Sequence, residues 1–278
     1  MTYTTKESVQ RRVEQHYDKA VSLGYEVFGC FAQGSMNYGD ELFDKDSDVD
    51  TKCLVIPSFV EICLNKKPVS FTHNMENGEH LDIKDIRLYL QLFKKQNVNI
   101  VEILFTQFYK INPKYEHIME KLWENRELIA RYDEARALNC MVGMIYEKQK
   151  ALCHPYPTLI EKIEKYGYDG KQLSHAMRIL DLMKSYCLGI KYQYCLEPTD
   201  GEVLMMIKRN VIVATVDAAK LRMEEIIEEA LEVRESYLKK HPNLSVKTEV
   251  DNLLEEIAVE VMYKSVIENS FFQRKEGL

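Results

Sequence analysis

Two aspartates separated by one residue are the side chains that point most directly to chemistry. Asp48 and Asp50 stand at the start of an apolar run, residues 49–56, that we expect to form a strand. Side chains two positions apart on a strand share a face, so the two carboxylates should project together. Like charges this close repel unless a cation separates them, and Mg²⁺ is typically held by one or two carboxylates plus substrate phosphates. The pair therefore predicts metal-dependent phosphate chemistry, whereas a solvated strand edge is the alternative explanation for an isolated Asp-x-Asp.

A Gly-Ser turn precedes the two aspartates and follows an apolar segment, residues 25–31, that we expect to be a buried strand. Gly34 would let the backbone approach a phosphate, and Ser35 would add a hydroxyl where a helix begins. Tyr38, in the same turn, is the nearest aromatic residue that could stack on a base. Turn and aspartates together predict a nucleotide site.

A later acidic strand, within residues 80–85, supplies a candidate third carboxylate. Strand alternation places Asp82 on the face away from the apolar side chains, where it could complete a second metal site and accept a proton from an attacking hydroxyl. Asp85 is the competing candidate, but capping of the following helix accounts for it. Lys52 shares the strand face of Asp50 and would either pair with the carboxylates or contact the nucleotide.

A basic stripe occurs in the second half of the chain. Lys171, His175 and Arg178 follow i, i+4, i+7 spacing, which places them on one face of a helix. Facing a cleft, they could bind a triphosphate and stabilise a pyrophosphate leaving group. An exposed polar helix face is the alternative.

These motifs resemble the DNA polymerase β-like nucleotidyltransferase superfamily, whose hallmark is Gly-Ser, then Asp-x-Asp, then a third acidic strand residue. The chain is most similar to the predicted RNA-ligase-associated nucleotidyltransferases of bacteria and phages. Residues 97–105 resemble that family's "NPNxxExLF" segment, with Val98 where proline is usual, and residues 168–179 resemble its Lys-x₃-His-x₂-Arg helix.

The resemblance implies an NTP substrate and two Mg²⁺ ions, for which Mn²⁺ can substitute, held by Asp48, Asp50 and Asp82. It also suggests an RNA 3′ end as the acceptor. The acidic composition, with 44 acidic against 37 basic residues, argues mildly against RNA and favours a protein or small-molecule hydroxyl, as in an antibiotic-type enzyme. The expected reaction is transfer of an NMP to an acceptor hydroxyl with release of pyrophosphate. A catalytically idle NTP-binding or antitoxin-like module is a further alternative, against which the three aspartates argue.

The strand-forming segments fall in the first part of the chain, and helical periodicity dominates the remainder. We expect an α+β protein with a polymerase-β-like catalytic domain of small mixed sheet and helices, residues 1–112, followed by an all-helical domain, residues 113–278. The expected strands are residues 25–31, 49–56, 69–73 and 80–83, and the expected helices are residues 5–23, 58–65, 85–93, 114–128, 130–152, 157–166, 171–189, 200–210, 214–240 and 249–268.

Composition predicts a cytoplasmic globular protein. The seven cysteines include no Cys-x-x-Cys pair, which favours reduced thiols over disulfides or a zinc site. We find neither an apolar run long enough to cross a membrane nor the apolar core of a signal peptide, so no membrane partner is expected. The patterns predict neither the preferred base nor the oligomeric state.

Overall fold

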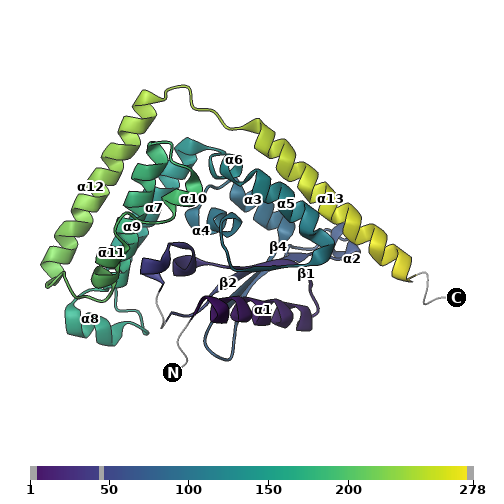
Figure 1. Ribbon diagram of the computed structural model, residues 1–278, viewed down its shortest axis with the longest axis horizontal. Coiled ribbons are helices and arrows are strands. Elements are labelled where there is room, and N and C mark those ends of the chain that lie inside the picture. The colour runs from purple at the N-terminus through teal and green to yellow at the C-terminus, as the bar shows by residue number, and fades with distance from the viewer. Residues whose placement is uncertain (1–4, 44–46, 274–278) are drawn as a thin grey trace.

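The computed structural model describes residues 5–43 and 47–273 and has an α+β architecture (Figure 1). A mixed sheet in the order β3-β4-β2-β1-β5 forms the centre of the N-terminal half. Strands β2 and β4 are parallel, and the other neighbouring pairs are antiparallel. The strands are β1 (Glu26–Ala32), β2 (Thr51–Ile56), β3 (Ser70–Asn74), β4 (His80–Asp85) and β5 (Tyr109–Ile111).

Helices cover the sheet, and together with the loops that connect them they make up the rest of the described chain. The α-helices are α1 (Lys6–Ser22), α2 (Phe59–Cys63), α3 (Ile86–Phe93), α4 (Val98–Val101), α5 (Glu116–Glu124), α6 (Arg126–Ala130), α7 (Glu134–Ala151), α8 (Ile160–Tyr166), α9 (Gly170–Cys187), α10 (Tyr192–Cys195), α11 (Gly201–Lys208), α12 (Val216–Lys240) and α13 (Thr248–Gln273). Short 3₁₀ turns are η1 (Gly34–Asn37), η2 (Asp40–Leu42), η3 (Glu102–Leu104) and η4 (Pro113–Tyr115).

The two faces of the sheet belong to different hydrophobic clusters because strand side chains alternate. Helix α1 contributes Val9 and Val13 to a smaller cluster that contains Cys53 and Val55 of β2. The intervening Leu54 and Ile56 point into the larger cluster, which the helices cover. Lys52 has the parity of Leu54 and Ile56, and Asp82 has the parity opposite to Leu81 and Ile83, so these two charged side chains face the helical half.

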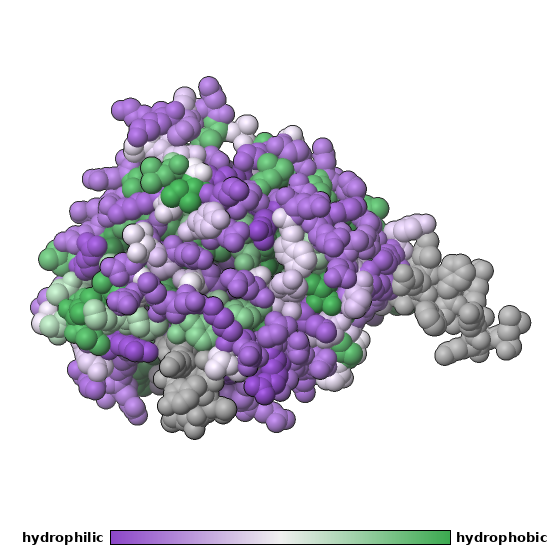
Figure 2. All heavy atoms as spheres, viewed as in Figure 1, coloured by the Kyte–Doolittle hydropathy of each residue, from purple (hydrophilic) through white to green (hydrophobic). Residues whose placement is uncertain are grey.

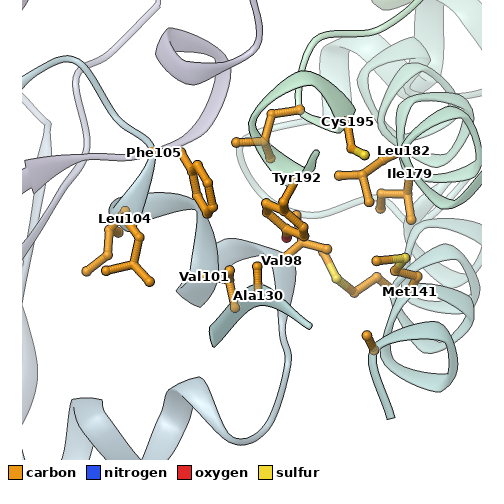
Figure 3. Packing of buried hydrophobic residues seen from close by; sticks show 14 of the residues in the cluster. Val98, Val101, Leu104, Phe105, Ala130, Met141, Ile179, Leu182, Tyr192 and Cys195 are labelled. Atoms are coloured by element: carbon orange, nitrogen blue, oxygen red, sulfur yellow. The ribbon is translucent and has the colours of Figure 1, made fainter. Parts of the chain in front are cut away.

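The larger cluster joins the sheet to the helices of the C-terminal half. Figure 3 shows Tyr192 between Phe105 on one side and Ile179 on the other, with Val98 next to Tyr192. Tyr192 and Phe105 pack with ring centroids 5.1 Å apart. A shared core of this kind fixes the position of α9 relative to the sheet.

The last helix returns to the N-terminal half. Helix α13 lies across α3 and α5, on the side of the molecule opposite α12 (Figure 1), and also contacts β2. Its buried residues include Leu254 and Ile257. The boundary expected between residues 112 and 113 stays a prediction, although one core contains residues from both sides of it.

The α+β class and the small mixed sheet are as expected from the sequence, but several boundaries differ. Strand β5 was not predicted, because three residues are too few for a periodic pattern. Strand β2 begins at Thr51, so both Asp48 and Asp50 precede it. The segment 114–128, expected as one helix, is η4 followed by α5 and α6, which Asn125 separates. The polar and acidic composition of residues 40–47 predicts a loop, and its residues 44–46 lie outside the described residues.

Hydrophilic residues cover most of the face shown in Figure 2, and hydrophobic residues form small separate groups on it. Among the described helices, none combines the length and the apolar character needed to span a membrane. All seven cysteines are free thiols.

Candidate functional site

A pocket of about 470 Å³ lies where the end of the sheet meets α7, α9 and α11. It brings together most of the residues that the sequence singled out, although they are up to 144 positions apart, from Gly34 to Arg178. Its lining is Gln33, Gly34, Ser35, Tyr38, Ser47, Asp48, Asp50, Asn99, Glu102, Met144, Lys148, Lys171, His175, Arg178, Ile179 and Lys208. Lys52 and Asp82 are not part of this lining.

The two aspartates enter the pocket from the segment just before β2. The carboxylate of Asp48 is exposed and makes no hydrogen bond or ion pair with the described residues. Asp50 accepts two hydrogen bonds at Oδ1, from the backbone N–H of His80 at 2.9 Å and from its Nδ1 at 3.0 Å. Oδ2 of Asp50 has no such partner within the described chain. The pair thus offers carboxylate oxygens that the protein itself leaves unused.

Asp82 is placed differently from the other two aspartates. Its carboxylate binds Nζ of Lys84 at 2.5 and 2.6 Å, and Nζ of Lys52 lies 3.5 Å from its Oδ2. The parallel register pairs Lys52 with Asp82 directly across β2 and β4. Burial lowers the pKa of Lys52, while Asp82 and Glu102 oppose that shift. Asp85 caps α3 through the N–H of Arg87 at 2.8 Å, which confirms its expected structural role.

The expected centre of three carboxylates is not formed. Among residues 5–43 and 47–273, no group of three or more His, Cys, Asp or Glu side chains has a geometry that could hold a metal ion. The unused oxygens of Asp48 and Asp50 nevertheless suit a hard cation that takes its remaining ligands from phosphates and water. Asp48 and Asp50 are therefore the residues that would hold Mg²⁺ or Mn²⁺, whereas the carboxylate of Asp82 is paired with Lys84 and Lys52 in the structure.

The Gly-Ser turn is held by a buried glutamate. Gly34 has a φ of 79°, which side chains rarely tolerate, and its N–H donates to Oε1 of Glu102 at 3.1 Å. The hydroxyl of Tyr38 donates to Oε2 of Glu102 at 2.5 Å. Burial raises the pKa of Glu102, and the hydrogen bond from Tyr38 and the charge of Arg178 oppose the shift. Glu102 thus fixes the turn from within, and the N–H of Gly34 is already occupied.

Arg178 lies over the ring of Tyr38, with Cζ 3.7 Å from the ring centroid. Its side chain is buried, at 4% exposure, yet it lines the pocket. Nε and Nη1 have no hydrogen-bond partner in the described residues. Buried donors of this kind are uncommon, because leaving one unsatisfied costs about 1–3 kcal/mol. Both nitrogens are almost inaccessible to solvent, so an anion in the pocket would reach them only after a local side-chain movement.

Four cationic side chains from three helices surround His175. Lys171 and Arg178 come from α9, Lys148 from α7 and Lys208 from α11. Burial lowers the pKa of His175 well below its usual value, and the charges of Arg178, Lys148, Lys171 and Lys208 lower it further. His175 is therefore neutral at pH 7, and its imidazole can donate one hydrogen bond and accept another without adding a positive charge to the pocket.

The sequence did not identify Lys148 and Lys208 as site residues, because helix periodicity does not show which solvated lysine faces a distant cleft. Glu102 carried a signal, since a carboxylate within an apolar run needs a partner or a cleft. Its position in the sequence favours a structural role, and its bonds to Gly34 and Tyr38 are of that kind.

A search with protein-family models finds no family that matches the chain. A search of curated proteins likewise finds no significant match.

Proposed function

We propose that this chain is a metal-dependent nucleotidyltransferase that transfers an NMP from an NTP to an acceptor hydroxyl. The observation that carries the proposal is the charge arrangement of one pocket. Two carboxylates with unused oxygens, Asp48 and Asp50, face it together with four cations, among them Arg178, whose Nε and Nη1 have no hydrogen-bond partner in the described residues. A metal–triphosphate complex is complementary to this arrangement, because its divalent cation would face the two carboxylates and its negatively charged phosphates would face the four cationic side chains.

Each residue group has a defined part in this proposal. Lys148, Lys171, Arg178 and Lys208 would bind the β- and γ-phosphates and stabilise the charge that develops on the leaving pyrophosphate. Ser35 would add a hydroxyl at the turn, and neutral His175 would donate a single hydrogen bond to a phosphate oxygen.

The reacting centre belongs to the sheet side of the pocket. Mg²⁺, when bound at Asp48 and Asp50, would neutralise phosphate oxygens during the in-line displacement. Attack by the acceptor oxygen on the α-phosphorus breaks the bond to the bridging oxygen of the β-phosphate. Asp82 remains the candidate proton acceptor, although its ion pairs with Lys84 and Lys52 must open before it reaches a hydroxyl in the pocket.

The direct test is the double substitution Asp48→Asn with Asp50→Asn. We expect it to abolish NMP transfer while the circular dichroism spectrum and unfolding midpoint stay close to those of the wild type, because neither carboxylate stabilises a buried partner. Transfer is measured with each α-labelled NTP, Mg²⁺ and total cell RNA, followed by RNase digestion. Label lost to RNase identifies an RNA acceptor, and label retained on protein identifies protein nucleotidylation.

A matched control is Asp18→Asn with Glu76→Gln, which removes the same charge from exposed positions outside the pocket. Transfer by the Asp48/Asp50 variant at the control's rate would contradict the proposal.

A second candidate function is NTP binding without transfer. The ion pairing of Asp82 with Lys84 favours it, because an engaged carboxylate neither binds a metal nor accepts a proton. Binding of labelled NTP with no incorporation in Mg²⁺ or Mn²⁺ would support this alternative.

A further inference from the structure

A fully buried carboxylate outside the pocket holds the segment that carries the two aspartates. Glu79 directly precedes β4 and has 0% exposure. Its Oε1 accepts the backbone N–H of Val49 at 2.5 Å. Val49 is itself buried and lies between Asp48 and Asp50 in the sequence. A hydrogen bond from its N–H therefore restrains the backbone on which both carboxylates are carried.

Three further groups converge on the same carboxylate. Oε2 accepts a hydrogen bond from Nδ2 of Asn77 at 2.7 Å and lies 3.3 Å from Nε2 of His16, and Arg12 forms an ion pair with Oε1. Burial opposes ionisation of Glu79, but the hydrogen bonds from His16, Val49 and Asn77 and the charge of Arg12 outweigh it and lower its pKa to about 2. Glu79 is therefore an anion throughout the neutral range.

The network also reaches the start of β2 from the far side of the sheet. His16 belongs to the buried face of α1, and its Nδ1 lies 2.8 Å from Oγ1 of Thr51. The next residue after Glu79, His80, holds Asp50 through its backbone N–H and Nδ1. Residues 49, 50 and 51 are thus each held by a hydrogen bond to helix α1, to the β3–β4 turn or to the start of β4. The carboxylate of Asp48 makes no such bond and lines the pocket.

We propose that Glu79 is a positioning residue, whose carboxylate anchors Val49 so that Asp48 and Asp50 both face the pocket in the orientation that binds a divalent cation. The inference rests on the proposed function, because it assumes that the two aspartates bind the metal. A carboxylate suits the role because it accepts from four donors, whereas a carboxamide of the same shape places an NH₂ group against at least one of them. Groups that orient metal ligands typically change metal affinity 10–100-fold when they are mutated.

The test compares Glu79→Gln with Glu76→Gln, which makes the same change on the same turn at an exposed residue. Mn²⁺ binding to the whole protein, without nucleotide, is measured from the electron paramagnetic resonance signal of free Mn²⁺. We expect the Kd for Mn²⁺ to rise at least tenfold in Glu79→Gln and to stay within twofold of wild type in Glu76→Gln.

A second readout does not depend on the metal. Hydrogen exchange of the peptide containing residues 47–51 should be faster in Glu79→Gln than in Glu76→Gln, because the N–H of Val49 loses its charge-assisted bond. If Glu79→Gln fails to fold, Asn77→Ala removes one of the bonds to Glu79 from an exposed turn residue. It should raise the Kd for Mn²⁺ severalfold and produce the same local increase in exchange.

The outcomes separate the inference from the proposed function. If Asp48→Asn with Asp50→Asn abolishes Mn²⁺ binding while the folded Glu79 or Asn77 variant binds as the wild type does, the positioning role is wrong and the metal site stands. If the Asp48/Asp50 variant binds Mn²⁺ normally, the metal assignment is wrong. The positioning role would also be wrong if hydrogen exchange at residues 47–51 of the Glu79 or Asn77 variant equals that of the wild type. This conclusion holds whether or not the variant binds Mn²⁺ normally, and even if its melting temperature is lower.

Discussion

Arg178 and Glu102 are charged residues that the fold buries almost completely, and both contact Tyr38. Glu102 is fully engaged by Gly34 and Tyr38, whereas two nitrogens of Arg178 have no partner among the described residues. The asymmetry assigns different roles. Glu102 stabilises the turn, whereas Arg178 stacks on Tyr38 and keeps two buried donors that no described residue uses.

His175 gives a prediction for the pH dependence of stability. Burial and four neighbouring cations hold its folded-state pKa well below the ordinary value of 6.5. Below pH 6.5 the unfolded chain therefore binds a proton that the folded protein does not, so the free energy of unfolding decreases as the pH falls. One such proton contributes at most about 1.4 kcal/mol per pH unit.

We expect the wild type to lose about 1 kcal/mol more stability than His175→Gln between pH 7.5 and pH 5.5, as urea unfolding at the two pH values would measure. Titrations common to both proteins, including that of Glu102, cancel in this difference. Substitution of the exposed His154 by Gln is the control. Parallel pH profiles for wild type and His175→Gln would show that His175 is not held neutral.

At the scale of elements, the site depends on how closely α9 and α11 approach. Gly170 is the first residue of α9, and a Cβ there would lie 2.2 Å from the carbonyl oxygen of Ile207 in α11. The contact brings Lys171, His175 and Arg178 on α9 beside Lys208 on α11. Only glycine allows this approach, so the cation cluster depends on a packing contact outside the pocket.

Gly170→Ala should therefore cost about 1–3 kcal/mol of stability, because the overlap is with backbone, and should weaken binding of a triphosphate. Gly143→Ala is the matched control within α7, since a Cβ at that position meets nothing within 4 Å. Alanine there should stabilise the protein by about 0.5–1 kcal/mol, through helix propensity alone. Thermal unfolding measures the change in stability, and binding of a labelled NTP measures the change in affinity. Equal changes in stability for Gly170→Ala and Gly143→Ala would show that the close approach of α9 and α11 does not require glycine.

At the scale of the molecule, the last helix ties the C-terminus to the sheet side. Helix α13 contacts α3, α5 and β2, and it buries Val250, Leu254, Ile257 and Val261. These residues belong to the same cluster as the core beneath the pocket. Packing far from the site therefore contributes to the stability of the half that carries Asp48 and Asp50.

Ile257→Ala should lower the free energy of unfolding by about 2–5 kcal/mol, because the residue is fully buried and the cavity would be lined by apolar groups. Val259→Ala, on the same helix but with 68% exposure, should change it by less than about 0.5 kcal/mol. Urea denaturation followed by circular dichroism distinguishes the two. A small effect of Ile257→Ala would mean that α13 does not fold as part of the common core.

The local features could be predicted from the amino-acid sequence. Apolar periodicity and capping residues placed β1, β3, β4, α1, α9 and α12 close to their observed bounds, because these signals arise between residues a few positions apart. The same reasoning identified the Gly34–Ser35 turn, the two aspartates and the basic face of α9. Asp85 as a helix cap was predicted for the same reason.

Which of these residues lie together depends on long-range packing. It brought Lys148 and Lys208 to the pocket, paired Asp82 with Lys84 and Lys52, and placed Glu79 behind Val49. Such contacts depend on strand register, helix approach and burial, which join positions far apart in the chain. A residue pattern shows that a carboxylate or an amine is present, but only packing determines whether a protein group already occupies it or leaves it open to a ligand.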